Sequence, residues 1–159
     1  MTVAEDKNNN MSATDGEILQ FVKVRLDKEW YGIPIRIVEN IVRMQRITRV
    51  PGSESYIKGV INLRGKVVPV MSLRLKMDMS EGEEIRSTRI IILKIDGDDV
   101  GMIVDEVREV ITLKNEDIEE VHKDLKTSNA AYLSGIGKLG GDLVSLLDMY
   151  EVLGVKQPG

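Results

Sequence analysis

Short runs of alternating apolar and polar residues run along most of this chain. Residues 18–26 (ILQFVKVRL) follow the two-residue period of a half-buried β-strand. A polar turn separates this strand from residues 30–37, so the pair is predicted to form a hairpin, in which Pro34 favours an edge or a bulge. Apolar residues three apart predict a single helical turn at 38–42, and a further strand is predicted at 44–50.

The stretch 56–73 (YIKGVINLRGKVVPVMSL) consists of two short apolar runs around a polar turn. It is predicted to form strands at 56–61 and 67–73, joined by a turn at 62–66. Gly65 can supply the positive φ that such a turn often requires.

A charged linker is predicted at 76–88, and the β pattern resumes after it. Residues 89–95 (RIIILKI) are strongly β-branched, and the Asp-Gly pair within 96–99 is typical of a hairpin turn. The returning strand is predicted at 100–111, and the polar residues 112–131 are expected to form a loop or a short strand.

The last part of the chain predicts a hairpin over 132–147 and a helix over 148–153. Asp148 can cap that helix, and Gly154 can end it before a tail at 154–159. At the other end, residues 1–16 are polar without periodicity and are expected to be a disordered leader.

The two halves of the chain repeat one another. At an offset of 69 or 76 residues, like residues coincide in the same order: Gly32 with Gly101, Val38 with Val107, Ile41 with Val110, Tyr56 with Tyr132, Gly59 with Gly135, Leu63 with Leu139, and Gly65 with Gly141. Arg64, in contrast, falls on Gly140. About ten short strands in two similar halves predict two small barrels or curled sheets packed on each other, with a groove between them.

Composition narrows the class of protein. The chain has 159 residues, 42% hydrophobic but only 4% aromatic, so its core must be aliphatic. No apolar run reaches the roughly 18 residues of a membrane helix, and no secretory signal or cysteine is present, so we expect a cytoplasmic protein without direct membrane insertion. The net charge is −4, with +4 in residues 1–80 and −8 in residues 81–159, which argues against a nucleic-acid partner.

Candidate chemistry is sparse, and no catalytic residue, metal site or cofactor is predicted. The single histidine, His122, lies in a polar acidic run, where a surface role is the usual one. The segment 96–101 begins like a calcium loop, but valines stand where later oxygen ligands are needed, and a hairpin turn explains it. Arg43, Arg46 and Arg49 are more typical of a solvated face than of a nucleic-acid patch.

Several motifs resemble the CheW family of bacterial chemotaxis adaptors. They are Tyr31-Gly32-Ile33, the string Gly59-Val60-Ile61-Asn62-Leu63-Arg64-Gly65 with Val67-Val68-Pro69-Val70, Val104-Asp105-Glu106-Val107, and Tyr132-Leu133-Ser134-Gly135. The resemblance covers residues 17–153. It implies an all-β fold with short helical turns, in which two five-stranded SH3-like barrels, at about 17–80 and 88–147, share a hydrophobic core within one domain.

The resemblance also implies a non-enzymatic scaffold at membrane-associated receptor arrays. Such an adaptor bridges the cytoplasmic tip of chemoreceptors to the regulatory domain of the histidine kinase CheA. By motif position, the receptor contacts would be Val38, Asn40, Asn62 and Arg64, and the kinase contacts Ile35, Ile41, Lys58 and Gly59. Many relatives have Glu where this chain has Asn40, and Asp where it has Ser72.

Three alternatives stay open from the sequence. Arg64 could instead form an ion pair within its own molecule, and Val38 and Ile41 could be core residues, as their repeat partners suggest. The whole protein could also be a docking module for one kinase or phosphorelay partner, without a receptor bridge. Simultaneous binding of receptor and kinase fragments distinguishes the adaptor from that module.

Overall fold

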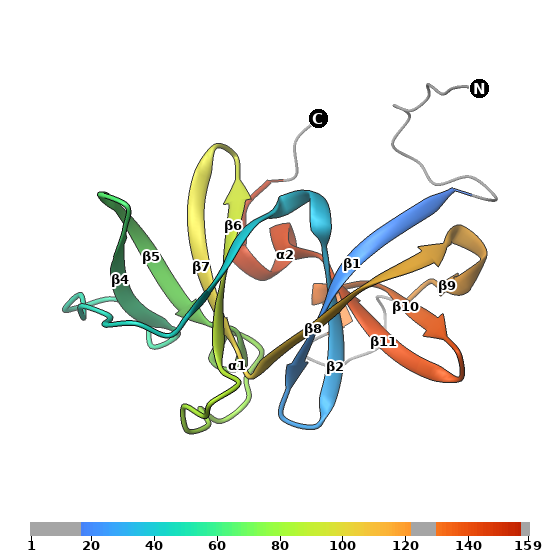
Figure 1. Cartoon of the computed structure of the whole chain (residues 1–159), viewed down its shortest axis with the longest axis horizontal. Coiled ribbons are helices and arrows are strands. Elements are labelled where there is room, and N and C mark those ends of the chain that lie inside the picture. Colours follow the sequence, from blue (N-terminus) through green and yellow to red (C-terminus); the bar gives the residue numbers. More distant parts are fainter. Residues whose placement is uncertain (1–16, 122–129, 157–159) are drawn as a thin grey trace.

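The computed structural model describes residues 17–121 and 130–156 (Figure 1). The predicted leader, His122 and the end of the tail lie outside these residues. In chain order the elements are β1 (Ile18–Leu26), β2 (Glu29–Pro34), the 3-10 helix η1 (Ile35–Ile37), β3 (Val38–Arg43), β4 (Ile57–Leu63), β5 (Lys66–Ser72), α1 (Leu73–Lys76), β6 (Arg89–Ile95), β7 (Asp98–Val104), β8 (Glu106–Lys114), η2 (Asn115–Asp117), β9 (Ile118–Glu119), η3 (Ala130–Tyr132), β10 (Leu133–Leu139), β11 (Asp142–Leu147) and α2 (Met149–Leu153).

The described strands form two sheets, which lie side by side in Figure 1. The five-stranded sheet has the order β3-β6-β7-β5-β4, and the six-stranded sheet has the order β8-β1-β2-β11-β10-β9. The predicted all-β class with short helices is confirmed. The short strand β9 gives one sheet a sixth member, and closure of either sheet into a barrel remains a prediction.

Each sheet combines the opening hairpin of one half of the chain with later strands of the other half. The β1–β2 hairpin lies beside β8, β10 and β11, whereas the β6–β7 hairpin lies beside β3, β4 and β5. When repeat-related strands are matched, the two sheets have the same order. The subdomain ranges 17–80 and 88–147 remain predictions, although each sheet takes strands from both ranges.

Repeated glycines lie where the two halves meet in parallel pairs, β2 with β11 and β7 with β5. A Cβ on Gly32 would lie 2.9 Å from Leu146 Cδ2, and a Cβ on Gly101 would lie 3.1 Å from Val70 Cγ2. Leu146 and Val70 are themselves repeat partners. The glycines therefore allow the same close approach of strands in both sheets.

The hydrophobic core has a shared centre and one smaller cluster for each sheet. The shared cluster includes Val24 of β1, Leu93 of β6 and Met149 of α2, so it draws on both sheets. The other clusters are built around Phe21 in the six-stranded sheet and around its repeat partner Ile90 in the five-stranded sheet. This arrangement confirms the predicted shared aliphatic core.

The helical turn predicted at 38–42 is wrong. Those residues belong to β3, which pairs with β6 with a register shift between Val38 and Asn40, and the helical turn is η1, at the end of the predicted strand 30–37. Pro34 closes the pairing of β1 with β2, because proline has no N–H to continue a ladder. The three-residue spacing of Val38 and Ile41, which had suggested a helical turn, belongs to a strand with a register shift between Val38 and Asn40.

Three other boundaries also differ from prediction. Instead of a strand at 44–50, a single bridge joins Thr48 to Val60. The predicted strand 100–111 is two strands, β7 and β8, with a corner at Asp105. The strand predicted at 67–73 ends at Ser72, which caps α1 by accepting a hydrogen bond from Leu75 N.

Candidate protein-binding surfaces

The turn between β4 and β5 presents Arg64 in a left-handed backbone conformation. The φ angles are 55° at Arg64 and 83° at Gly65, and at the repeat positions Gly140 and Gly141 they are 56° and 91°. Asn62 Oδ1 accepts a hydrogen bond from Gly65 N at 3.0 Å. Two consecutive positive φ angles suit the twist of a two-residue hairpin turn, but for a residue other than glycine this conformation costs about 1–2 kcal/mol.

The Arg64 side chain is exposed. Among the hydrogen bonds and ion pairs of residues 17–121 and 130–156, none involves its guanidinium. The alternative of an internal ion pair is therefore not observed. Neighbouring Lys66, in contrast, pairs with Asp99 at 3.0 Å.

The predicted contact residues on η1 and β3 differ in exposure. Val38 is partly buried and packs against the shared core, which favours a core role. Asn40 Oδ1 accepts a hydrogen bond from Ile41 N at 2.8 Å, so the oxygen of this side chain is already bonded to the backbone of β3. Ile41 and Ile35 are 39% and 37% exposed, which leaves apolar surface for a partner.

The predicted contact residues on β4 are held by their own chain. Lys58 forms an ion pair with Glu81 of the linker. Gly59 is buried at φ 142°, and a Cβ there would lie 2.8 Å from the carbonyl carbon of Thr48. This approach follows from the two 2.8 Å hydrogen bonds between Thr48 and Val60. The structure thus explains Gly59 by backbone packing alone.

The structure divides each predicted contact set between the two edges of the five-stranded sheet. Val38, Asn40 and Ile41 lie on the edge strand β3, whereas Lys58, Gly59 and Asn62 lie on the opposite edge strand β4. Within the described part of the chain, no strand pairing or polar contact joins the two groups directly. The residue roles therefore stay predictions.

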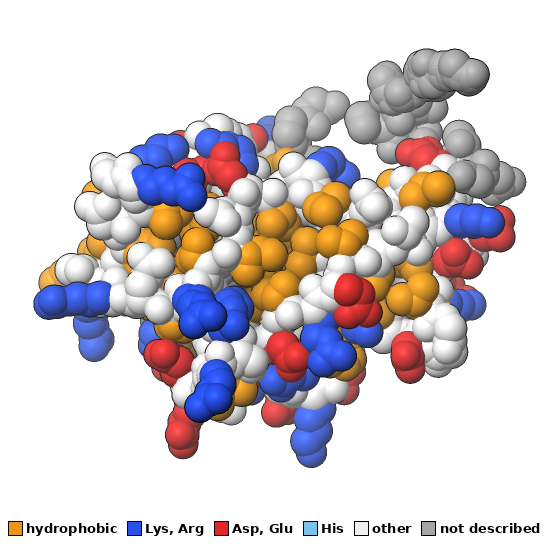
Figure 2. Space-filling model, viewed as in Figure 1, with side chains coloured by type: hydrophobic (Ala, Val, Ile, Leu, Met, Phe, Trp, Pro, Cys, Tyr) orange, Lys and Arg blue, Asp and Glu red, His pale blue; other side chains and the backbone are white. Residues whose placement is uncertain are grey.

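Exposed apolar side chains recur at repeat-related positions that sequence reasoning did not select. Val67 in β5 is 68% exposed and its partner Leu143 in β11 is 64% exposed. Val110, the partner of Ile41, is 45% exposed. The overlay at an offset of 69 already pairs Val110 with Ile41, and extending the overlay at an offset of 76 would have identified Val67 and Leu143. Figure 2 shows further hydrophobic side chains gathered across the middle of the face that it presents.

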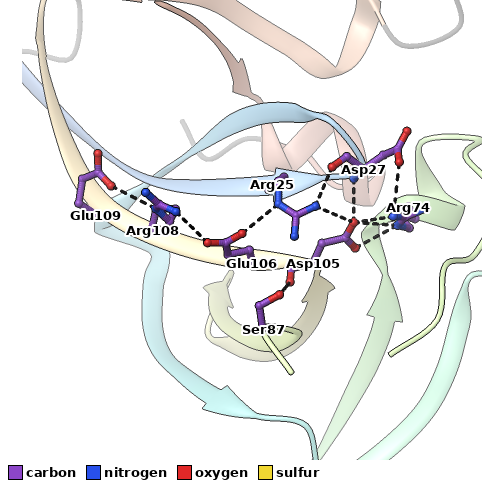
Figure 3. Close-up of polar contacts among 8 residues, drawn as sticks. All are labelled: Arg25, Asp27, Arg74, Ser87, Asp105, Glu106, Arg108 and Glu109. Atoms are coloured by element: carbon purple, nitrogen blue, oxygen red, sulfur yellow. Dashed lines mark hydrogen bonds and ion pairs between the residues drawn. The ribbon is translucent and has the colours of Figure 1, made fainter. Parts of the chain in front are cut away.

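A polar network joins the two sheets at the β7–β8 corner (Figure 3). Asp105 accepts hydrogen bonds from Arg74 Nη2 at 2.6 Å and from Asp27 N at 2.7 Å. Arg25 lies next to it and donates to Glu106 at 3.0 Å. Arg74 belongs to α1, directly after β5 of the five-stranded sheet, and Arg25 belongs to β1 of the six-stranded sheet. The Asp105 carboxylate therefore connects elements of both sheets.

The carboxylates of Asp105 and Asp99 are both paired with cations. Burial acts to raise the pKa of Asp105, but hydrogen bonds from Arg74 and from Asp27 N outweigh it and lower the pKa. Lys66 and Lys94 lower the pKa of Asp99 to about 2. Asp98 and Asp99 begin β7 and pair with Ile95 and Lys94 of β6, so the segment forms the predicted hairpin. Among the described residues, no group of three His, Cys, Asp or Glu side chains could hold a metal ion.

Comparisons with known proteins identify relatives over most of the chain. A family model described as a CheW-like domain matches residues 20–157. The chemotaxis protein CheW of Helicobacter pylori is 36% identical over 86% of this chain and 82% of its own length. The CheW of Bacillus subtilis is 40% identical over 77% of this chain and 79% of its own length.

A solved structure agrees with these sequence relatives. The scaffolding protein TtCheW of Thermoanaerobacter tengcongensis matches with a TM-score of 0.80 and 31% identity, over 87% of this chain and 94% of that chain. In the described part of the present chain, no helix is long and apolar enough to cross a membrane. The strand exchange, the shared core and these matches together place the chain in the CheW family of chemotaxis scaffold proteins.

Proposed function

We propose that this protein is a non-enzymatic adaptor that couples the cytoplasmic tips of chemoreceptors to the histidine kinase CheA. Its receptors would recruit it to membrane-associated arrays, and the regulatory domain of the kinase would bind a second surface. The observation that carries the proposal is the backbone conformation and exposure of Arg64. An exposed arginine occupies a left-handed turn position, where its repeat partner is glycine, and its guanidinium forms no hydrogen bond or ion pair among the described residues.

Receptor binding is assigned to Val38, Asn40, Asn62 and Arg64. Arg64 supplies a rigidly presented guanidinium that can donate to carboxylates or to exposed carbonyl groups of a receptor helix. Asn62 holds the turn through Gly65 N, so it acts by positioning Arg64. Asn40 has its oxygen engaged in the β3 bulge, which leaves its amide N–H groups for a partner acceptor.

Kinase binding is assigned to Ile35, Ile41, Lys58 and Gly59. The two isoleucines are exposed and supply apolar contact area. Lys58 is held by Glu81, so a kinase carboxylate would have to share or displace that partner. Gly59 contributes by letting the Thr48 segment pack closely on β4.

A substitution at Arg64 tests the receptor surface because it separates binding from folding. We expect Arg64→Gly to fold at least as stably as the native protein and to weaken binding of a chemoreceptor cytoplasmic fragment by about tenfold to a hundredfold, as the loss of charge-assisted hydrogen bonds predicts. Titration calorimetry with the fragment measures this effect. Arg49→Ala, which removes an exposed arginine from another loop, is the matched control. Unchanged receptor affinity in Arg64→Gly would contradict the assignment.

Simultaneous binding tests the adaptor itself. The full chain is mixed with a receptor fragment and the kinase regulatory domain, separately and together, and the complexes are separated by gel filtration. We expect a ternary peak of the combined mass. Mutually exclusive complexes, or binding of the kinase domain alone, would instead support the single-partner docking module.

A further inference from the structure

The internal repeat duplicates a surface pocket as well as the strands. One pocket, of about 230 Å³, lies beside α1, and we call it the linker pocket. Another, of about 210 Å³, lies beside the start of α2, and we call it the open pocket. Six lining positions correspond through the repeat: Lys58 with Ser134, Ser72 with Asp148, Arg74 with Tyr150, Thr88 with Leu19, Ile103 with Pro34, and Asp105 with Arg36.

Backbone geometry supports the correspondence. Ser72 N donates to Tyr56 O at 2.8 Å, and Asp148 N donates to Tyr132 O at 2.8 Å. After each helix the chain turns back in the same way. Met79 N donates to Arg74 O at 2.8 Å, and Val155 N donates to Tyr150 O at 3.0 Å. The two pockets are therefore two copies of one structure with different side chains.

The linker pocket is lined in part by an acidic segment of its own chain. Residues 81–84 (EGEE) contribute to its wall. Arg74 Nη1 donates to Ser80 O at 3.2 Å, and Lys58 pairs with Glu81. A Cβ on Gly82 would lie 2.8 Å from Arg74 Cζ, so the linker backbone lies directly on the guanidinium. The pocket thus holds an acidic segment through two cations.

Fewer charged side chains line the open pocket than the linker pocket, and the repeat equivalents of the acidic segment that begins at Glu81 lie at 157–159, outside the described residues. Its apolar lining includes Leu19, Phe21 and Met149. A neighbouring hollow of about 260 Å³ continues this surface to Ile18, which is 61% exposed, and to Ile35.

Two polar features indicate what the open pocket accepts. Arg36 lines both hollows and is exposed, and its side chain forms no hydrogen bond or ion pair among the described residues. Asp148 is already engaged, because its carboxylate caps α2 by accepting from Tyr150 N at 3.1 Å and from Glu151 N at 3.3 Å. Arg36 is therefore the cation that the pocket lining offers to a ligand.

We propose that the open pocket binds an extended acidic peptide segment of a partner protein. An apolar side chain of that peptide would lie on Leu19, Phe21 and Met149, and an adjacent carboxylate would pair with Arg36. The linker on the first pocket is an internal example of the same mode of binding. Relative to that pocket, Arg74 becomes Tyr150, Lys58 becomes Ser134 and Thr88 becomes Leu19, so the open pocket has more apolar surface beside a single cation, Arg36.

The backbone next to the pocket suits an extended ligand. β1 pairs with β8 from Ile18 onward, but it pairs with β2 only from Phe21 onward. The side of β1 that faces the hollow is thus outside the β1–β2 ladder over Ile18–Gln20. An extended peptide could add main-chain hydrogen bonds there, as peptides do at other sheet edges.

The test is a methyl NMR titration of the full chain with two synthetic octapeptides, one of alternating Glu and Leu and one of alternating Lys and Leu. We expect the Glu peptide to shift the methyl resonances of Leu19, Leu147 and Met149, and to leave those of Met44 and Ile103 in the linker pocket unchanged. Arg36→Glu should weaken this binding at least tenfold, and Arg49→Glu, the matched control, should not. The amide spectrum of each variant checks that it folds.

Several outcomes would overturn the proposal. They are equal binding of the Lys peptide, shifts confined to the linker pocket, or no effect of Arg36→Glu. Methyl shifts that depend on protein concentration without peptide would assign the pocket to a second copy. Binding that appears only after removal of residues 1–16 or 157–159 would assign it to the chain's own ends. The proposal does not rest on Arg64, so receptor binding by Arg36→Glu distinguishes its failure from failure of the adaptor function.

Discussion

Arg64 and Gly140 adopt nearly the same φ, 55° and 56°, at equivalent turns, so the difference between them lies in the side chain. Glycine adopts this conformation without strain, whereas arginine does not. The overlay of the two halves identified the pair, because turn glycines and the residues around them coincide. The left-handed φ of Arg64, and the absence of a partner for its guanidinium among the described residues, came only from the structure.

This comparison predicts opposite effects of substitution at the two turns. Arg64→Gly should raise the free energy of unfolding by about 0.5–1 kcal/mol, since relief of the strained φ is partly offset by the greater entropy of glycine in the unfolded chain. Gly140→Ala should lower it by about 1 kcal/mol, since it introduces the same strain. Urea unfolding measures both. A loss of stability in Arg64→Gly would mean that the side chain makes a stabilising contact within the protein.

At the scale of elements, the repeat is more complete than the sequence pattern indicated. The Thr48–Val60 bridge corresponds to the pairing of β9 with β10, where Glu119 faces Ile136. One copy is a short strand and the other a single bridge. The glycines Gly59 and Gly135 precede these contacts in both halves, and each lies where a Cβ would meet the crossing segment.

Comparing alanine substitutions at Gly59 and Gly52 therefore separates the cost of a steric clash from the cost of a positive φ. Gly59→Ala should lower the free energy of unfolding by more than about 3 kcal/mol for two reasons. The added Cβ would clash with the Thr48 backbone, and alanine would have to adopt an unfavourable positive φ. Gly52 has a φ of 77° and open space where a Cβ would lie. Gly52→Ala should therefore lower the free energy of unfolding by only about 1 kcal/mol. Urea unfolding of the two variants checks the difference. Equal losses would show that the Thr48 segment moves aside.

At the scale of the whole molecule, the exchange of strands makes each half depend on the other. The opening hairpin of each half completes the sheet of the other half, and the Asp105 network adds a polar connection at one end of the shared core. We expect the two sheets to unfold together for this reason, in a single transition.

Asp105→Asn should weaken that connection and change the response to acid. Losing the charge-assisted hydrogen bonds from Arg74 should cost about 2 kcal/mol above pH 5. Because the folded-state pKa of Asp105 lies below its ordinary value of 3.8, its stabilisation is complete above that value and is lost as the pH falls through the folded-state pKa. Asp105→Asn should therefore lose less stability than the native protein on acidification below pH 4.

Thermal unfolding between pH 7 and pH 2 measures this effect, and Asp98→Asn, an exposed aspartate in β7, is the control for a change of net charge. An unchanged acid response in Asp105→Asn would show that other carboxylates dominate. Two separate transitions in the native protein would contradict cooperative unfolding of the sheets.

The all-β class, the duplication, most hairpins and the capped helix at Asp148 could be predicted from the residues alone, because alternation and turn chemistry are local properties. The sequence also carried the family resemblance, in motifs that include Arg64. The folded chain was needed to show which hairpin joins which sheet, that residues 38–43 form a strand, and that Asp105 lies at a corner between two strands. These features depend on pairing between residues far apart in the chain, which no local pattern encodes. The same limit applies to the two pockets, since each is built from both halves of the repeat and only folding brings its walls together.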